Sequence, residues 1–192
     1  MSPRSQEKIE QIRSQSITKI LNAAFELMAR NGYEATSISQ IASKAGVSKG
    51  LMYNYFASKE ELLQALIHSA FGEADMLMSN ILTNDPKETL KNLFDWYFTE
   101  LRERPQQWRL ITELTLKIDK FDFVQDLAKH KMKEFVLFIT DLLKQIGWEH
   151  ATEEAQLIAG LFDGIGIQYL VIRKDYPLDE IENYLIRKYC SE

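Results

Sequence analysis

Lysines, hydroxyl side chains and a glycine gather in one short segment between Thr36 and Lys59. Lys49 can donate hydrogen bonds to O6 and N7 of guanine, and Leu51 offers an apolar contact for the methyl group of thymine. Gly50 costs a helix roughly 1 kcal/mol relative to alanine, and a backbone that must approach a base edge or a phosphate closely gives a reason for it. Side chains suited to phosphate contacts lie along the edges of the segment, at Thr36, Ser37, Ser48, Tyr53, Tyr55 and Lys59.

The pattern around these positions predicts two short helices joined by a tight turn. Ser37 and Gln40 have the spacing of a capping box, which opens a helix through Ala45. Residues 46–48 interrupt the helical pattern, and a second helix follows over 49–56. This arrangement matches a helix-turn-helix, in which the first helix braces against the sugar-phosphate chain and the start of the second enters the major groove.

Helical spacing separates the two sides of the second helix. Met52 and Phe56 are four residues apart and are predicted to face the core, which leaves Lys49, Tyr53 and Asn54 on the outward side. An alternative interpretation stays open, because helix-turn-helix geometry also occurs in proteins that never touch DNA, and the tyrosines would then serve packing alone.

Nearly every other segment has the apolar spacing of a helix rather than of a strand. A first helix ends at Asn31-Gly32, and a longer helix opens at Ser58. Further helices are predicted over 87–104, 106–118, 122–146, 152–174 and 178–190. The predicted fold class is therefore all-α, with a three-helix helix-turn-helix domain over residues 1–60 and a helical domain over residues 61–192.

Charge is distributed unevenly along the chain. The net charge of −5 by itself argues against a nucleic-acid partner, since phosphate binding needs cations. Residues 1–60, however, carry eight Lys and Arg against five Asp and Glu, a net charge of +3, and the remaining residues carry a net charge of −8. A basic N-terminal segment and an acidic C-terminal segment indicate two separate functions.

Three features predict a cytoplasmic protein that does not enter a membrane. Cys190 is the one cysteine, so no intrachain disulfide can form. Residues 2–16 are mostly polar where an export signal would be apolar. The longest apolar stretch, residues 157–172, contains Asp163 and Gln168, and we expect it to be too short to span a bilayer.

The sequence argues against an enzyme. The three histidines have no zinc-binding spacing, and Gly164 and Gly166 lack the third glycine and the preceding strand of a dinucleotide site. Cys190 has no recognisable base beside it. We therefore expect no metal and no cofactor.

Four runs of residues together resemble the signature of the TetR/AcrR family of regulators. They are ILNAAF at residues 20–25, NGYEATS at 31–37, IA with AGVS at 41–48, and Y-x-YF-x-x-KE-x-L at 53–62. Order and spacing hold over about residues 16–63. The resemblance implies a homodimer whose N-terminal domain binds double-stranded operator DNA and whose C-terminal domain binds a small-molecule inducer. It also implies that residues 49–51 read bases and that the six edge side chains contact phosphates.

For the C-terminal domain, which lies beyond the matched residues, the resembled family implies a ligand pocket between the helices that follow residue 85. We expect its lining to include Trp96, Phe98, Trp108, Phe135 and Phe162, although the same aromatic side chains would suit any helical core. The last two helices are expected to form the dimer bundle. Its apolar seam would consist of Ile165, Ile167, Tyr169, Leu170, Tyr184, Leu185 and Tyr189, with Gly160 and Gly164 allowing close helix approach.

The leading hypothesis is a repressor that leaves its operator when an apolar or amphipathic ligand binds. A rival hypothesis is a helical small-molecule carrier or protein-interaction module that keeps the helix-turn-helix only for packing, and activation in place of repression also stays open. Residues 1–15 extend beyond the usual start of the family's first helix, and they would form an arm in the minor groove, a frayed helix or a solvated tail.

Overall fold

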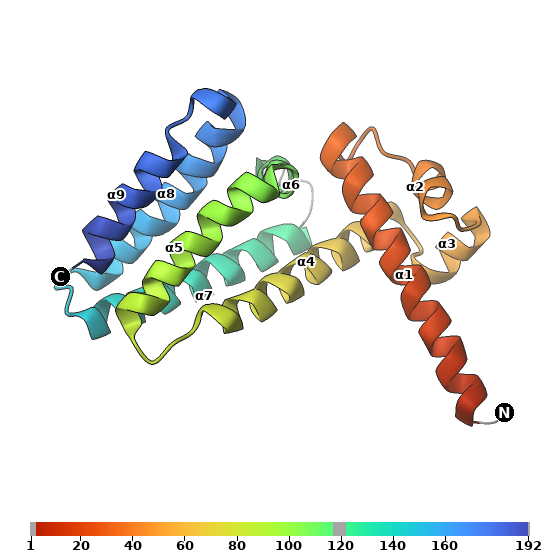
Figure 1. The fold of residues 1–192 in the computed structure, drawn as a ribbon. Helices are drawn as coiled ribbons and strands as arrows, with labels where there is room; N and C mark the ends of the chain where they lie inside the picture. The colour runs from red at the N-terminus through yellow and green to blue at the C-terminus, as the bar shows by residue number, and fades with distance from the viewer. Residues whose placement is uncertain (1–2, 117–121, 192) are drawn as a thin grey trace. The chain divides into compact units, whose positions relative to one another are not determined.

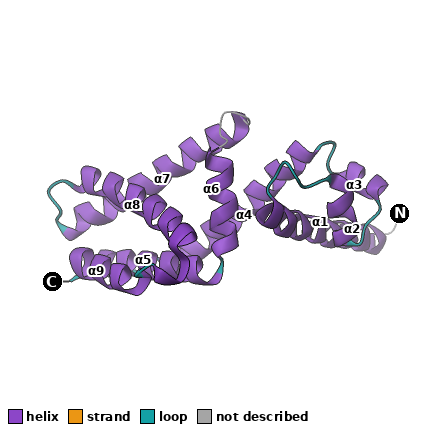
Figure 2. Cartoon of the chain, turned by 90° about the horizontal axis from the view of Figure 1, so that it is seen from above, coloured by secondary structure: helices purple, strands orange, loops and turns teal. Residues whose placement is uncertain are grey.

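The computed structural model describes residues 3–116 and 122–191, and within these ranges every regular element is a helix (Figures 1 and 2). The predicted all-α fold is confirmed. The chain divides into two compact units, Met1–Glu73 and Ala74–Glu192, with the division inside helix α4 (Lys59–Ile81). The functional boundary at residue 60 stays a prediction.

The first unit, here called the reading unit, contains α1 (Pro3–Asn31), α2 (Ile38–Ala45), α3 (Lys49–Tyr55) and the start of α4. Its core is apolar because each helix turns one stripe inward. The stripe contributes the buried side chains Ile20, Ala24, Met28, Ile41, Met52, Phe56, Leu62 and Leu63.

Helix α1 includes residues 3–15, for which the sequence left open an arm, a frayed helix or a solvated tail. It is helical from Pro3, and its first half extends beyond α2 and α3 (Figure 1). Ile9 and Ile12 continue the apolar spacing of α1, yet both are more than half exposed, since no helix of the unit covers them. A helix is 10–12 Å wide and the minor groove about 6 Å, so a helical arm does not fit into that groove.

The second unit, here called the regulatory unit, contains the end of α4 and five further helices. These are α5 (Pro86–Glu103), α6 (Pro105–Leu116), α7 (Asp122–Ile146), α8 (Ala151–Ile172) and α9 (Leu178–Cys190), with a short 3-10 turn at Arg173–Asp175 between the last two. Helix α5 is the central helix, because its buried side chains belong to a core that also takes residues from α7, α8 and α9. The helix predicted over 106–118 is described up to Leu116, and its last two predicted positions lie outside the described residues.

Residues Ala151–Asp175 differ from expectation in one respect. By length and composition alone this helical segment could cross a membrane, and a third of its most apolar window is buried within the chain. The buried positions include Ile158, Phe162 and Ile165, which pack into the core of the regulatory unit. The segment therefore serves as a core helix with one exposed apolar face.

Candidate nucleic-acid interface

Local caps fix the turn between α2 and α3. The Ser37 side chain accepts a hydrogen bond from the Gln40 backbone (3.3 Å), and the Ser37 backbone N–H donates to Gln40 Oε1 (2.8 Å), which completes the predicted capping box. Gly46 ends α2 with φ of 69°, a left-handed conformation that glycine adopts without steric cost. Ser48 then caps α3 by accepting from the Leu51 N–H (3.1 Å).

Helix α3 has one buried side and one open side. Met52 is 1% exposed and lies in the core, whereas Tyr53 is 50% exposed. Lys49, Gly50 and Asn54 are exposed as well, as the spacing predicted, and Leu51 is half-buried rather than fully open. The first turn of α3 therefore exposes the Lys49 ammonium group and the backbone of Gly50 to solvent.

Gly50 has no structural role that the described contacts would explain. Its backbone is not left-handed, and a Cβ atom built at this position would meet only Ser48 Oγ, at 3.9 Å. Alanine would therefore fit and would favour the helix. No contact among the described residues therefore requires a glycine at this position, and a bare backbone here leaves room for the close approach of another molecule.

Thr36 does not lie on the surface where a phosphate contact was predicted. The residue is 1% exposed, and its Oγ1 donates toward the backbone oxygens of Leu27 (3.2 Å) and Gly32 (2.9 Å). Its backbone N–H donates to the Tyr33 oxygen (3.2 Å). Both donors of Thr36 are thus used to fasten the loop between α1 and α2, so its contribution is to the loop and not directly to a phosphate.

Lys59 is held where the loop after α1 meets the start of α4. Its Nζ donates to the Glu34 backbone oxygen (3.3 Å) and lies 4.1 Å from the centre of the Tyr33 ring. Partial burial lowers the pKa of Lys59, while the neighbouring Glu34 carboxylate opposes this effect. Sequence reasoning missed the Tyr33 contact, because nothing in a one-dimensional pattern joins residues 26 positions apart.

The remaining predicted phosphate contacts stay at the edges of the unit. Ser37 and Ser48 are exposed, Tyr55 is half-buried, and the Ser48 hydroxyl hydrogen is not used by its capping bond. At the start of α4, the Ser58 side chain accepts from the Glu61 N–H (3.0 Å) and the Glu61 carboxylate accepts from the Ala57 N–H (2.6 Å). The predicted cap is present, and the acidic Glu61 belongs to it.

Comparison with known proteins identifies the family. Residues 20–66 match the model of the bacterial regulatory proteins of the tetR family. The HTH-type transcriptional regulator in the lacX 3' region of Lactococcus lactis is 31% identical over 139 residues, which cover 65% of this chain and 70% of that protein. The chain belongs to the TetR family. Because this family consists of DNA-binding transcriptional regulators, the predictions of a regulator and of a non-enzyme are confirmed.

Two further comparisons, one of sequence and one of structure, show how much of this TetR-family chain its relatives match. The regulator YerO of Bacillus subtilis is 36% identical over 133 residues, 67% of this chain but 46% of YerO. The chain spans about half the length of the first curated relatives that it matches. The crystal structure of FadR from Bacillus subtilis in complex with stearoyl-CoA superposes with a TM-score of 0.73 over 91% of this chain and 97% of FadR, at 23% identity, which shows a shared fold.

The regulatory unit of this TetR-family chain brings most of the predicted ligand-lining residues into one aromatic cluster. The Tyr97 ring stacks on Phe162 (3.9 Å between centroids) and meets Phe98 and Trp108 edge-on, each at 5.2 Å, while Phe135 lies 5.7 Å from Phe162. Tyr97 donates its hydroxyl to the Phe162 backbone oxygen, and burial raises the pKa of Tyr97 far above its usual value. Phe98 and Phe162 are therefore core residues, and their role in ligand binding stays a prediction.

Trp96 of α5 packs against the same core. Its side chain is partly buried against the core, and its indole Nε1 is fully buried with no hydrogen-bond partner in the part of the chain that the structure describes. A buried donor without a partner is costly, typically about 1–3 kcal/mol. Such a group calls for an explanation, and a bound molecule with an acceptor oxygen is one.

Proposed function

We propose that the chain is a homodimeric repressor of the cytoplasm that binds operator DNA through α3 and leaves it when an amphipathic ligand binds the regulatory unit. The observation that carries this proposal is the open start of α3. Lys49 and Gly50 are exposed there, opposite the buried Met52, and Gly50 has room for a side chain that it does not carry. This is the geometry that lets a recognition helix approach bases closely.

We assign two kinds of DNA contact within the reading unit. Lys49, Gly50 and Leu51 would meet base edges, because they occupy the first turn of α3. Phosphates would be held by the side chains at the unit's edges, namely Ser37, Ser48, Tyr53, Tyr55 and Lys59. Thr36 is left out of the proposed contacts because it is buried, whereas Ser37, whose hydroxyl donates to Gln40 Oε1 (2.8 Å), is exposed.

The exposed apolar face of α8 and α9 supports the proposed homodimer. Leu157 is 59% exposed and Tyr184 58%, and Leu161, Ile167 and Val171 are also exposed. A large exposed apolar patch marks an interaction site. Of the predicted seam, Ile165, Leu185 and Tyr189 instead lie in the subunit's own core, because they face the interior of the unit. A two-fold dimer would read two half-sites about 34–36 Å apart, or a multiple of that distance.

We propose a long-chain acyl thioester as the ligand class to test first. The buried polar or charged residues described in the regulatory unit are two threonines, so its interior suits an uncharged chain with few polar groups. The Trp96 Nε1 donor could pair with a carbonyl oxygen of such a molecule. The FadR structure holds stearoyl-CoA, which supports the choice. Ligand must favour the dimer geometry that no longer fits the groove spacing, since equal affinity for both geometries would shift nothing.

Selection of bound duplexes from a random pool tests DNA binding, half-site symmetry and spacing together. We expect enriched sites with two-fold symmetry, and an affinity that falls steeply as salt rises because counterions are released on binding. Indifference to every duplex at low salt would favour the rival carrier or interaction module.

Titration of the selected duplex complex with stearoyl-CoA tests the regulatory half of the proposal. We expect release of the duplex by stearoyl-CoA and no release by coenzyme A alone. Replacement of Trp96 by phenylalanine should raise the stearoyl-CoA concentration needed while leaving duplex affinity unchanged. A reporter gene behind the selected site then decides between repression and activation.

A further inference from the structure

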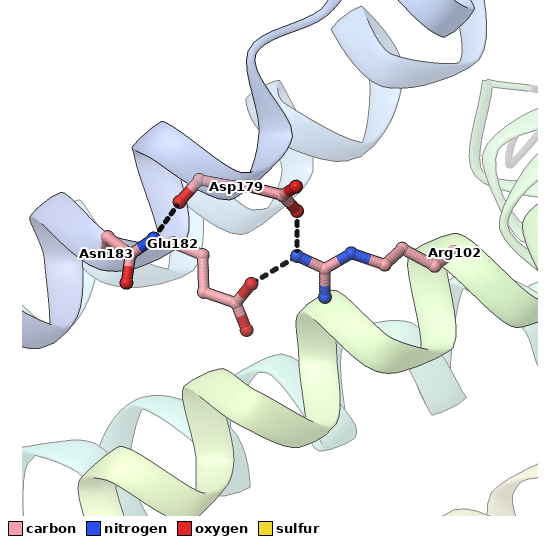
Figure 3. Close-up of polar contacts among 4 residues, drawn as sticks. All are labelled: Arg102, Asp179, Glu182 and Asn183. Carbon is pink, nitrogen blue, oxygen red and sulfur yellow. Dashed lines mark hydrogen bonds and ion pairs between the residues drawn. The ribbon is translucent and has the colours of Figure 1, made fainter.

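Two groups of polar contacts fasten α9 to its own subunit, one near each end of the helix. At its start, Arg102 of α5 donates from Nη2 to Asp179 Oδ1 (2.5 Å) and to Glu182 Oε2 (Figure 3). We call Arg102, Asp179 and Glu182 the Arg102 clamp. The Glu182 side chain is only 16% exposed, so the clamp is partly shielded from water. The hydrogen bond from Arg102 to Glu182 raises the pKa of the guanidinium further.

The second group lies at the end of α9. Tyr189 donates its hydroxyl to Glu154 Oε2 of α8 (2.7 Å) and accepts from Lys188 Nζ (2.9 Å). Its ring also packs against Phe94 and Trp148, at 5.9 and 5.2 Å between centroids. This end of α9 is therefore tied to both α5 and α8 by a buried aromatic side chain.

Between these two ends, α8 and α9 leave an apolar groove of about 290 Å³. Its α8 side includes Gly160, Leu161 and Gly164, and its α9 side includes Ile181 and Tyr184. A Cβ atom built at Gly160 or Gly164 would meet nothing within 4 Å, so the floor of the groove is open. Helix α9 packs chiefly on α5 rather than on α8. The width of the groove thus depends on where α5 holds α9.

We propose that Arg102 is a positioning residue for homodimerisation, because its clamp sets the width of the groove that receives apolar side chains of a second copy. The inference rests on the proposed homodimer. A second copy is the fitting occupant because a two-fold interface uses the same surface on both partners, and here exposed apolar side chains line and flank an apolar groove on the same two helices. Leu157, Leu161 and Tyr184 supply those side chains.

The geometry of a guanidinium suits this role better than that of an ammonium. Its planar, rigid fork fixes the direction as well as the distance of its partners, whereas the lysine ammonium is a point charge on a flexible stem. Asp179 and Glu182 lie three residues apart on one face of α9, and one nitrogen of Arg102 reaches both. Loss of that nitrogen leaves two like charges side by side at the start of α9.

Sedimentation equilibrium of the full chain measures the effect on the dimer. Arg102→Met should weaken dimerisation on the order of tenfold, Glu182→Gln less so, and Arg102→Lys should restore part of the loss. Lys44→Met is the control, since it breaks an ion pair of similar length, Lys44–Glu26 (2.6 Å), in the reading unit and should leave the dimer unchanged. Circular dichroism reports the helix content of each variant. A positioning role requires that the variants keep the helix content of the wild type.

The outcomes distinguish a failure of the proposed homodimer from a failure of the role proposed for Arg102. A wild-type chain that stays monomeric at every concentration overturns the proposed homodimer. A dimeric wild type with unchanged dimer affinity in Arg102→Met overturns the positioning role alone. The same holds if Arg102→Met and Glu182→Gln both lose helix content, because Arg102 would then act on the fold rather than on the interface. A weaker dimer with full helix content supports the inference.

Discussion

The reading unit and the regulatory unit place their functional side chains by different means. In the reading unit, α2 and α3 have eight and seven residues, and both are positioned by caps that act over three residues. In the regulatory unit, the central contact joins Tyr97 and Phe162, which are 65 residues apart. One unit is specified locally, and the other by long-range packing of aromatic rings.

This difference teaches how far function and stability can be separated. On α3 the exposed Lys49 and the buried Met52 lie on opposite sides of the helix, so recognition can change without loss of the core. In the regulatory unit, Phe98 and Phe162 are both predicted ligand contacts and core residues. A change there alters both properties, whereas a change on the open side of α3 alters one.

The largest effect is expected from a change in the regulatory core. Phe94→Ala should lower the free energy of unfolding by about 3–5 kcal/mol, because Phe94 is fully buried between Phe162 and Tyr189. Urea unfolding followed by circular dichroism reports on both units, since both are built of helices. The exposed Tyr53→Ala serves as control and should change stability by less than about 0.5 kcal/mol. Equal losses in both variants would remove the contrast between the units.

Lys49→Ala tests whether a change on the open side of α3 alters DNA affinity without altering stability. Affinity for the selected duplex should fall by about 1–3 kcal/mol if Lys49 contacts a guanine, and the free energy of unfolding should not change. Fluorescence anisotropy of a labelled duplex measures the affinity. Lys144→Ala, an exposed lysine on α7, is the control. An equal loss in the control would mean that only overall charge matters.

Thr36→Val sharpens the comparison within the reading unit. It should lower the free energy of unfolding by about 1 kcal/mol, since the bonds from Thr36 Oγ1 to the Leu27 and Gly32 oxygens are lost. The slope of duplex affinity against salt concentration should stay the same, because no phosphate contact disappears. Thermal unfolding and a salt titration check both statements, with the exposed Thr99→Val as control. A shallower salt slope would return Thr36 to the phosphate contacts.

Gly50→Ala is expected to change stability and duplex affinity in opposite directions. The free energy of unfolding should rise by up to about 1 kcal/mol, because alanine favours the helix and its Cβ has room. Duplex affinity should fall, since the added methyl group holds the backbone away from the DNA. Stability and anisotropy measurements on the same preparation compare the two signs. A gain in affinity would contradict the close approach proposed for Gly50.

Much of the reading unit could be predicted because its signals are local. The Ser37–Gln40 box, the left-handed Gly46 and the Ser48 cap each act between residues at most a few positions apart, so their spacing is visible in the chain itself. The regulatory helices were predicted close to their observed ends for the same reason. Which aromatic side chains would meet each other could not be predicted, because many pairings suit the same helical spacing.

Residue types and short-range spacing were thus sufficient for the helices, the recognition turn, the open side of α3 and the family of the protein. Contacts between distant residues decided the rest: the Tyr33 ring beside Lys59, the stacking of Tyr97 on Phe162, and the Arg102 clamp across 77 and 80 residues. The physical reason is one of range. A cap or a turn is a bond between near neighbours, whereas burial and ion pairing across helices depend on how whole elements pack.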